Sequence, residues 1–432
     1  KKKLAKQLAA CRTEQGLSKA SLEHYLKVCG KQFSKLLSSQ QVQAEADRVW
    51  CGVERCLFGN GKELHFKKLM DFDTIGGKSN KNGARFDLDA MYVNWLGLSL
   101  KCYLPKSENS LSYVWESLKG KISYCNIKRL MFSSGWRYYA EIVVSGAAPT
   151  RVSIGTSTMG IDPGVSTIAG VSEDACVLEE LAPNAIQYEK KIQKISQRMD
   201  RSRRISNPNK YNEDGTINRS NRDPWKYSKN YVKMCRLLKS LYRKKHAYIV
   251  DSHRELCNKL ITIAKYFPVE KMHFQALQKK AKETKRQEKK TEVKQKDGTV
   301  KVIQKYKRKK RFGRSINRRA PARFLLELER KAEAVGGVYA EVDTKEFKAS
   351  QYNHVTDAYE KIPLSQREKE IGKRKVQRDL YSAFLIRNAD LDFKHPDREK
   401  CEYEFEYFAD MQDQLILKMK ESGLSMRQCF GF

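Results

Sequence analysis

The sequence has no long apolar run, no recognisable secretion signal and a shortage of acidic residues. No run of 18 or more apolar residues occurs, which excludes a transmembrane helix. The segment Lys1-Lys2-Lys3-Leu4 lacks the apolar core of a signal peptide, and without an initiator Met the native chain is expected to begin earlier. The 51 acidic residues face 85 Lys and Arg, which gives a net charge of +34. Such an excess indicates a polyanionic partner, for which nucleic acid is favoured over a membrane surface.

The eleven cysteines do not include a single Cys-x-x-Cys pair. In a long basic chain without a signal peptide they are expected to be reduced and mostly buried thiols. Cys51 and Cys56 could share a metal ion, but no second pair completes the site, so zinc is not expected. The sequence also lacks a Walker loop, a dinucleotide-binding fingerprint, a Ser-His-Asp arrangement and histidines at ligand spacing.

Apolar periodicity divides the first part of the chain into helical and β-rich stretches. Residues 1–60 are predicted to be helical, because their apolar residues recur at spacings of three and four. Over 62–149, short β-prone runs alternate with turns rich in Gly, Asn and Ser, which predicts a small β-barrel or sandwich. Two strands joined by a tight turn are predicted from Met159. Residues 186–260 are predicted to be mostly helical, with a polar loop over 204–226.

The most biased segment is 279–314, where 17 of 36 residues are Lys or Arg and four are acidic. Its low apolar content predicts a loop that is mobile in the free protein. A helix starting at Pro321 and a strand over 338–342 are predicted next. The stretch 345–375 is polar and predicted to be irregular, and helices are predicted from Val376 onwards.

Three acidic residues occupy positions that suggest catalysis. Asp162 ends a predicted strand, Glu270 follows the apolar run 266–269, and Asp379 begins a predicted helix. Two strand ends and a helix start are where a ribonuclease-H-like α/β fold gathers its carboxylates. Mg²⁺ prefers oxygen ligands, and two such ions about 4 Å apart can stabilise the attacking and leaving oxygens of a phosphodiester. The trio therefore predicts a metal-dependent nuclease site.

Each acid alone also has a structural interpretation. Asp162 stands in an ordinary Asp-Pro-Gly turn sequence, Glu270 could be a solvated strand end, and Asp379 suits the first turn of any helix. Pro268 argues against a central strand just before Glu270. It is the ordered trio in a basic chain that favours the catalytic interpretation.

Two basic clusters, 198–204 and 305–311, are candidates for nucleic-acid contacts. The run 305–311 also has the composition of a nuclear-localisation signal or a solvated tail, but the charge of the whole chain favours nucleic acid. The candidate contact residues are Arg201, Arg203, Arg204, Lys307, Arg308, Lys309, Lys310, Arg311, Arg318 and Arg319.

Three sequence blocks resemble the RuvC motifs of a nuclease family, in the family's order: 160–165, 269–277 and 377–384. Residues 77–81 and 137–146 resemble the same family's β-rich wedge domain. On these blocks the sequence resembles the TnpB family of transposon-encoded RNA-guided nucleases and the compact type V CRISPR effectors related to it.

The resemblance implies an α/β multi-domain fold with a ribonuclease-H-like (RuvC) nuclease core, a β-barrel wedge domain and a helical recognition lobe. The first strand of the wedge would precede residue 1. The implied domains are the recognition lobe (1–61), the wedge (62–158), the nuclease core (159–344) with a helical insertion (186–265) and a basic loop (279–314), a degenerate target-nucleic-acid-binding lobe (345–375), and the third RuvC motif with C-terminal helices (376–432).

The resemblance also implies a site chemistry and partners. Asp162, Glu270 and Asp379 become the catalytic triad that binds two Mg²⁺ ions, for which Mn²⁺ can substitute. The implied partners are a guide RNA and a target double-stranded DNA, bound by a monomer or a homodimer on one guide. The implied location is the prokaryotic cytoplasm, near the nucleoid, without a membrane.

Two departures from the family pattern are visible. The usual pair of Cys-x-x-Cys knuckles is missing from 345–375, where 352–354 (Tyr-Asn-His) stand in place of the first knuckle, so a zinc-free lobe is expected. The third motif reads Arg-Asp-Leu-Tyr-Ser-Ala rather than the commoner Arg-Asp-x-Asn-Ala-Ala, but it keeps the Asp.

The leading hypothesis from the sequence is an RNA-guided DNA endonuclease. The alternatives are an RNA-guided DNA binder that does not cleave, a DDE-type transposase that acts without guide RNA, and a ribosomal-type RNA binder. The retained acidic trio argues against the non-cleaving binder. The wedge-like β region, which a transposase of that class does not need, argues against the transposase.

Overall fold

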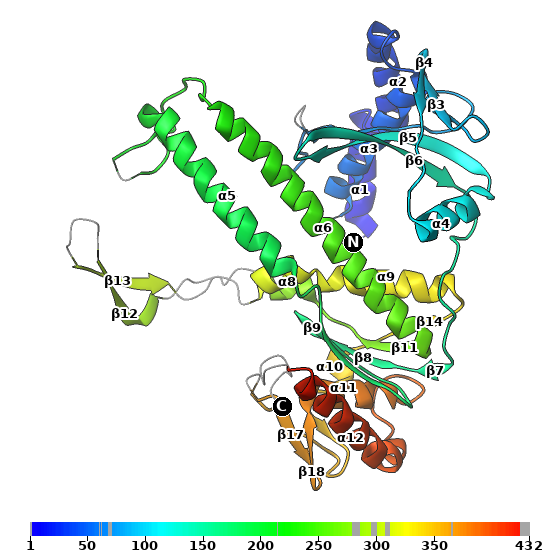
Figure 1. The fold of residues 1–432 in the computed structure, drawn as a ribbon, viewed down its shortest axis with the longest axis vertical. Helices are drawn as coiled ribbons and strands as arrows, with labels where there is room; N and C mark the ends of the chain where they lie inside the picture. Colours follow the sequence, from blue (N-terminus) through cyan, green and yellow to red (C-terminus); the bar gives the residue numbers. More distant parts are fainter. Residues whose placement is uncertain are drawn as a thin grey trace. The chain divides into compact units, whose positions relative to one another are not determined.

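The computed structural model divides the chain into two compact units of mixed helices and strands (Figure 1). Unit 1 comprises residues 1–149 and 227–240, and unit 2 comprises 150–226 and 241–432. No helix in the part of the chain described is both long and apolar enough to cross a membrane. The structure describes residues 2–59, 61, 63–67, 71–213, 215–278, 286–294, 300–306, 312–363 and 366–423.

Unit 1 begins with helices, as the periodicity predicted. These are α1 (Lys2–Glu14), α2 (Lys19–Gly30) and α3 (Ser39–Leu57). The hydroxyl of Ser18 starts α2 by accepting a hydrogen bond from the backbone N–H of Ser21 at 3.0 Å. Helix α3 buries Ala44, Ala46 and Trp50.

Unit 1 continues with two three-stranded antiparallel sheets, in the orders β1-β5-β6 and β2-β3-β4, and with a helix between β4 and β5. Their apolar side chains share one small core. The elements are β1 (Thr74–Ile75), β2 (Arg85–Asp87), β3 (Tyr92–Trp95), β4 (Leu98–Lys101), α4 (Glu108–Leu118), β5 (Ile122–Phe132) and β6 (Gly135–Val144).

The predicted β-barrel is wrong, because the described strands of unit 1 stay in two separate sheets and β6 is an edge strand. Helix α4 lies within the region predicted to be β-rich. Its signal is present, since Leu111, Val114 and Leu118 recur at helical spacing. The surrounding β-prone runs obscured this short helix.

Unit 2 is built on a central mixed sheet in the order β10-β9-β8-β11-β14, and β7 also pairs with β11. Strands β8, β9 and β10 are consecutive and antiparallel, whereas β11 runs parallel to both β8 and β14. The strands are β7 (Ser157–Thr158), β8 (Gly160–Pro163), β9 (Thr167–Val171), β10 (Cys176–Glu180), β11 (Ala264–Glu270) and β14 (Val338–Val342).

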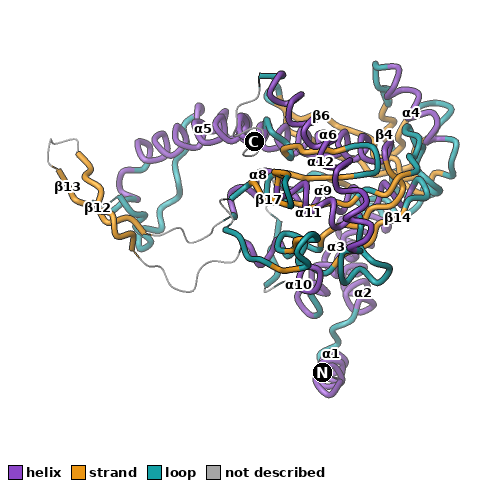
Figure 2. Tube along the Cα trace, turned by 90° about the horizontal axis from the view of Figure 1, so that it is seen from below, coloured by secondary structure: helices purple, strands orange, loops and turns teal. Residues whose placement is uncertain are grey.

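Helices cover both faces of this sheet. On one face, Ile161 and Val269 pack with side chains of α6 (Lys229–Ile263) and α9 (Pro321–Ala334). On the other face, Ala169 and Val342 pack with α11 (Arg378–Arg387) and α12 (Arg398–Glu421). Figure 2 shows α9, α11 and β14 in this region. Successive side chains of a strand point to opposite faces of the sheet, so each strand contributes residues alternately to the two cores.

Pro268 lies inside β11, although the sequence argued against a strand there. On one side it is paired in register with Ala340 of β14. On the other side, β7 pairs with β11 only as far as Tyr266, and β8 begins to pair at Val269. Pro268 therefore falls at the break between these two neighbours, where no ladder hydrogen bond from its nitrogen is needed.

The predicted helical stretch before β11 is confirmed. Helix α5 (Ala185–Ser206) lies against the part of α6 that follows residue 240, where the rings of Tyr188 and Tyr248 are 5.8 Å apart. The polar stretch after α5 lacks α-helix as predicted but is packed, because the buried amide of Asn207 donates to the carbonyl oxygen of Lys226 at 2.7 Å.

The basic segment 279–314 is not wholly a loop. Strands β12 (Arg286–Lys294) and β13 (Val300–Tyr306) pair as an antiparallel hairpin, so the loop prediction is wrong there. The segment contains β-branched residues that favour strands despite its high charge, such as Thr291, Val293, Val300 and Val302. A short helix, α8 (Gly313–Arg319), follows. Residues 307–311 lie outside the described residues.

The stretch 345–375 is also more regular than predicted. It contains two hairpins. The buried ammonium of Lys369 in the second hairpin donates to the carbonyl oxygen of Tyr352 in the first. Buried His354 accepts or donates a 2.8 Å hydrogen bond with the hydroxyl of Tyr381, and its ring lies 4.7 Å from that of Phe405. Buried aromatic packing therefore organises this lobe. The elements are α10 (Thr344–Phe347), β15 (Tyr352–Asn353), β16 (Ala358–Tyr359), β17 (Glu368–Ile371) and β18 (Arg374–Gln377).

Acid is expected to destabilise unit 2 through His253 on α6, which packs edge-on against Phe324. Burial lowers the pKa of His253 to about 4, whereas an unfolded histidine titrates near 6.5. Between these values the unfolded chain binds a proton that the folded chain does not. Stability is therefore lost as the pH falls through this window, by on the order of 3 kcal/mol.

The variant His253→Leu should lose less stability than the wild type between pH 7 and pH 4, as measured by urea unfolding followed by tryptophan fluorescence. The matched control is His65→Leu, because the His65 side chain is 81% exposed. Equal losses in the wild type and His253→Leu would contradict the prediction.

Candidate active site

The three predicted acids come from three elements that meet on one face of the central sheet of unit 2. Asp162 lies near the end of β8 and Glu270 is the last residue of β11. These strands are parallel, and Ile161 is in register with Val269, so the two acids are level with each other. Since Ile161 and Val269 face α6 and α9, the acids that follow them face α11.

Helix α11 reaches this face because β8 begins with a glycine. A Cβ atom at Gly160 would lie 2.1 Å from the carbonyl oxygen of Ala383 and 2.3 Å from the backbone nitrogen of Arg387. Only the absence of a side chain lets the helix backbone lie so close to the strand. This contact brings the first turn of α11, with Asp379, to the strand that carries Asp162.

Buried glutamines position the start of α11. The side-chain oxygen of Gln377 accepts a hydrogen bond from the backbone N–H of Leu380 at 2.7 Å and so caps the helix. The backbone N–H of Gln377 donates to the side chain of Gln412 on α12 at 2.7 Å. The side-chain Nε2 atom of Gln377 lies 3.4 Å from the Oδ2 atom of Asp379. Gln377 thus contacts Asp379 directly, and Gln412 of α12 fixes the position of Gln377.

Two arginines contact the carboxylate of Asp379. The Nη2 atom of Arg378 lies 3.1 Å from Oδ1, and the Nη1 atom of Arg367 lies 3.4 Å from Oδ2. The Asp379 side chain is only 17% exposed, so these charges act in a partly desolvated place. Neither arginine is among the residues predicted to belong to the site. Arg378 directly precedes Asp379 in the third motif, which is a usable signal, whereas Arg367 has none.

Burial and neighbouring negative charge raise the pKa values of Asp162 and Glu270. Burial raises the pKa of Asp162 well above its usual range, and the negative charges of Glu270 and Asp379 raise it further. Burial also raises the pKa of Glu270, and the charge of Asp379 adds to this effect. The site is therefore short of positive charge, which a bound cation would supply.

The donor chemistry of the trio fits a hard divalent cation, since three carboxyl groups offer only oxygen ligands. In the described ranges, however, no group of three or more His, Cys, Asp or Glu side chains is arranged so that it could hold a metal ion. Asp379 directs its oxygens to Arg367 and Arg378 instead. A metal ion would have to replace at least part of these guanidinium contacts.

The predicted nucleic-acid contacts on α5 differ in their surroundings. Arg201 is exposed to solvent. Arg203 and Arg204 both pair with Asp200, at 2.8 and 2.9 Å. Their guanidinium groups also lie over aromatic rings, that of Arg203 over Trp225 at 5.5 Å and that of Arg204 over a tyrosine at 4.5 Å. Ion pairs and ring contacts therefore already engage Arg203 and Arg204.

The other predicted contacts lie on and before α8. Arg318 is paired with Glu189 at 2.7 Å, and Arg319 is paired with Glu180. Both arginine side chains are less than one-fifth exposed, at 17% and 11%. They therefore tie α8 to neighbouring elements of unit 2. The remaining predicted contacts, Lys307, Arg308, Lys309, Lys310 and Arg311, lie outside the described residues, and a role in nucleic-acid binding stays a prediction for the whole set.

Comparisons with known proteins add little to this geometry. No protein-family model matches the sequence, and no curated protein matches it. A solved structure titled "Cryo-EM structure of CRISPR-Cas12f Ternary Complex" is similar over 91% of this chain and 79% of that chain, with 15% sequence identity and a TM-score of 0.30. A TM-score this low does not establish a shared fold.

Proposed function

We propose that this protein is an RNA-guided DNA endonuclease that hydrolyses phosphodiester bonds at Asp162, Glu270 and Asp379. The observation that carries the proposal is the convergence of the three acids. They are separated by more than a hundred residues from one to the next along the chain, yet the charges of Glu270 and Asp379 both act on Asp162. If the three acids had only structural roles in a turn, at a strand end and at a helix start, nothing would require them to lie close together.

The topology of the central sheet supports a ribonuclease-H-like core. Three consecutive antiparallel strands, β8 to β10, are followed by two strands parallel to the first, β11 and β14. Helices lie on both faces of the sheet, and the acids lie at the ends of its adjacent central strands β8 and β11. The sequence resemblance to RuvC motifs implies this kind of core.

The acids would hold Mg²⁺, or Mn²⁺ as a substitute, and the bound ions would supply positive charge to the attacking and leaving oxygens of the phosphodiester. The residues of the chain contribute binding and orientation. Gln377 and Gln412 fix the start of α11. The guanidinium group of Arg367, which is 47% exposed, would contact a phosphate once Asp379 binds a cation.

The proposed partners of the protein are a guide RNA and a target DNA. The charge of +34 suits a partner with many phosphates. Under this proposal, residues 1–61 form the recognition lobe, 62–158 form the wedge without a closed barrel, and 345–375 contact the target without zinc. Base pairing with the guide would select the target DNA, and the protein would recognise heteroduplex shape and a short flanking motif.

A second candidate is a guided binder that does not cleave. The observation that favours it is the pairing of Asp379 with Arg367 and Arg378, which leaves the trio in an arrangement unsuited to a metal ion. A cleavage assay separates the two candidates, because both bind target DNA and only the first cuts it.

The decisive experiment is to extract and sequence the nucleic acid that co-purifies with the untreated protein. We expect one dominant structured RNA with a variable or target-matching end. The protein reconstituted with that RNA should cut matching DNA in Mg²⁺ and not in EDTA. Heterogeneous RNA, or no RNA, would contradict the guided function. A specific RNA without Mg²⁺-dependent cutting would favour the non-cleaving binder.

A further inference from the structure

Asp379 differs from the other two acids of the proposed site, because positive charge already contacts its carboxylate. Its Oδ1 atom lies 3.1 Å from the Nη2 atom of Arg378, and its Oδ2 atom lies 3.4 Å from the Nη1 atom of Arg367. Among the described residues, no lysine or arginine forms an ion pair with Asp162 or Glu270. Both carboxylate oxygens of Asp379 are therefore in contact with a guanidinium group rather than open to a metal ion.

The two arginines differ in how firmly they are held. The Arg378 side chain is 10% exposed, and its Nη1 atom also donates a hydrogen bond to the carbonyl oxygen of Gln366 at 3.2 Å. The Arg367 side chain is 47% exposed, and in the described chain it pairs with no acid other than Asp379. An ion pair as exposed as this one contributes little to stability. Arg367 is therefore the cation that can leave Asp379 with little loss of stability.

The hairpin of β17 and β18 holds the backbone of both arginines. Arg367 directly precedes β17, Arg378 directly follows β18, and the adjoining residues Glu368 and Gln377 are in register. The backbone N–H of Arg378 donates to the carbonyl oxygen of Arg367 at 2.8 Å. The Arg367 side chain can therefore change its direction while its backbone keeps its place near Asp379.

A guanidinium group and a divalent cation compete for the same carboxylate. Mg²⁺ coordinates oxygen atoms at about 2.0–2.1 Å. An ion on the Oδ2 atom of Asp379 would thus lie close to the Nη1 atom of Arg367, which is 3.4 Å from that oxygen. Like charges repel strongly at short range in a partly desolvated place. A phosphate offers Arg367 an alternative partner, because guanidinium groups form bidentate, charge-assisted hydrogen bonds with phosphate.

We propose that Arg367 is a positioning residue that keeps Asp379 from binding a metal ion until a substrate phosphate binds the guanidinium group. This role rests on the proposed function and adds that nucleic acid regulates the loading of the metal. Phosphate and cation then bind with positive coupling, since each removes an obstacle to the other. The arrangement of the free site, which is unsuited to a metal ion, is its resting state.

The test measures the binding of Mn²⁺, the substitute ion, to the full chain after bound nucleic acid has been removed at high salt. Free Mn²⁺ is quantified by electron paramagnetic resonance at about 0.1 M salt, where a basic chain retains DNA. Each protein is titrated without DNA and with saturating single-stranded oligothymidine of about ten nucleotides. No guide RNA is present, and a gel verifies that the DNA stays intact. The readout is a binding constant, which requires no catalysis.

The wild-type chain should bind Mn²⁺ about tenfold more tightly with the oligonucleotide than without it, a usual size for coupling between two sites. Arg367→Gln should bind Mn²⁺ about tenfold more tightly than the wild type when DNA is absent, and DNA should then change its affinity by less than about twofold. Arg367→Lys should lie closer to the wild type, because it keeps the positive charge. A merely structural role of Arg367 would not produce this loss of coupling.

The matched control is Arg374→Gln. Arg374 lies in the same hairpin, its side chain is 30% exposed, and it pairs with Asp410 of α12. This variant removes the same charge from the chain, so its Mn²⁺ binding and the effect of DNA should match those of the wild type. A change as large as that in Arg367→Gln would show that net charge, rather than the contact with Asp379, controls metal binding, and would overturn the inference.

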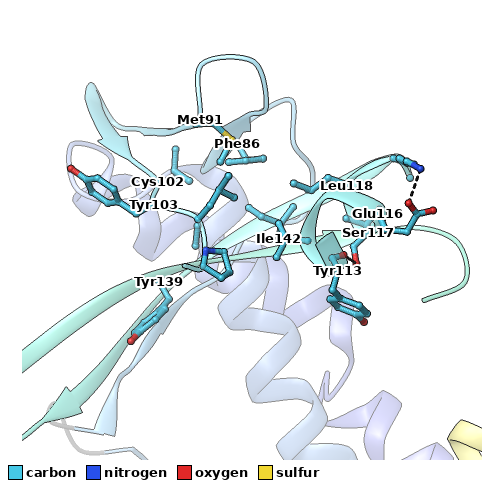
Figure 3. A pocket seen from close by; sticks show the side chains of 18 of the residues that line it. Phe86, Met91, Cys102, Tyr103, Tyr113, Glu116, Ser117, Leu118, Tyr139 and Ile142 are labelled. Atoms are coloured by element: carbon cyan, nitrogen blue, oxygen red, sulfur yellow. Dashed lines mark hydrogen bonds and ion pairs between the residues drawn. The ribbon is translucent and has the colours of Figure 1, made fainter. Parts of the chain in front are cut away.

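Mn²⁺ bound elsewhere on the chain is subtracted with the double variant Asp162→Asn/Asp379→Asn. The large cavity of unit 1, about 1380 Å³ in volume, is not a competing site (Figure 3). Its lining includes a single acid, Glu116, which pairs with Lys119 at 2.6 Å. A lone carboxylate that is already paired offers a divalent cation too few oxygen ligands. The difference between the wild type and the double variant therefore reports on the acidic trio.

Equal trio-dependent Mn²⁺ affinities of the wild type and Arg367→Gln without DNA would overturn the inference. Coupling to DNA that persists in Arg367→Gln would overturn it as well. Both results leave the nuclease proposal standing, because the trio still binds metal. The absence of trio-dependent Mn²⁺ binding in every protein, with and without DNA, would instead refute the nuclease proposal together with the inference.

Discussion

Replacing Asp162 with Asn is expected to slow guided DNA cleavage by about a thousandfold or more, because metal ions contribute several kcal/mol to stabilising a phosphoryl transition state and each 1.36 kcal/mol is a factor of ten. Glu270→Gln and Asp379→Asn should have effects of the same order. Guided binding of target DNA should change by less than about threefold, since these acids repel phosphates rather than attract them. Cleavage is measured in single-turnover assays and binding by filter retention.

The matched control for these variants is Glu341→Gln. Glu341 lies on β14, next to β11 in the same sheet, but its side chain is 48% exposed and pairs with Lys271. Its removal should leave cleavage within about twofold of wild type, because an exposed pair of this kind contributes little. Full activity in any one of the trio variants would remove that residue from the site. Loss of binding together with cleavage would instead indicate a folding defect.

The variant Gly160→Ala is expected to destabilise unit 2 by about 3 kcal/mol or more, the upper end of what overpacking costs. The added Cβ would lie 2.1 Å from the carbonyl oxygen of Ala383 and 2.3 Å from the backbone nitrogen of Arg387. Both atoms belong to the backbone of α11, so they cannot move aside without shifting the helix. Thermal unfolding and limited proteolysis measure the loss, and surviving protein should cleave poorly because Asp379 moves with α11.

Gly52→Ala is the control for adding a methyl group to a glycine. In α3 the added Cβ would meet only the flexible end of Leu64, at 3.3 Å. Alanine is favoured over glycine inside a helix by about 1 kcal/mol, so this variant should be neutral or slightly stabilising. A wild-type melting temperature for Gly160→Ala would show that α11 does not pack directly on β8.

The three acids could be predicted because their signals are local. Each acid can be recognised from a short stretch of sequence. Asp162 ends a strand before Pro-Gly, Glu270 ends an apolar run, and Asp379 lies in the first turn of a helix. Their convergence required only the assumption that such ends meet at one sheet. The break that accommodates Pro268 could not be predicted, since it depends on where β7 ends and β8 begins on the neighbouring side of β11.

The groups that orient the acids had weaker signals or none. Gln412 lies 33 residues after Asp379 (412 − 379) on another helix, and a lone glutamine in an amphipathic pattern indicates nothing by itself. Arg367 precedes Asp379 by twelve residues, across a hairpin. The barrel was predicted because alternating apolar runs indicate strands without indicating which strands pair. Closure depends on long-range pairing, which one sequence does not encode visibly.

The separation of the acids along the chain affects when a newly made protein becomes active. Asp162 and Asp379 are 217 residues apart (379 − 162), so a ribosome needs roughly 10 to 40 s to add the third acid after the first. Residues 1–149, which make up most of unit 1, emerge before any of the three. Under the proposed function, a nascent chain could therefore acquire its RNA while it is still harmless to DNA. A product of interrupted synthesis that stops before α11 would be permanently inert.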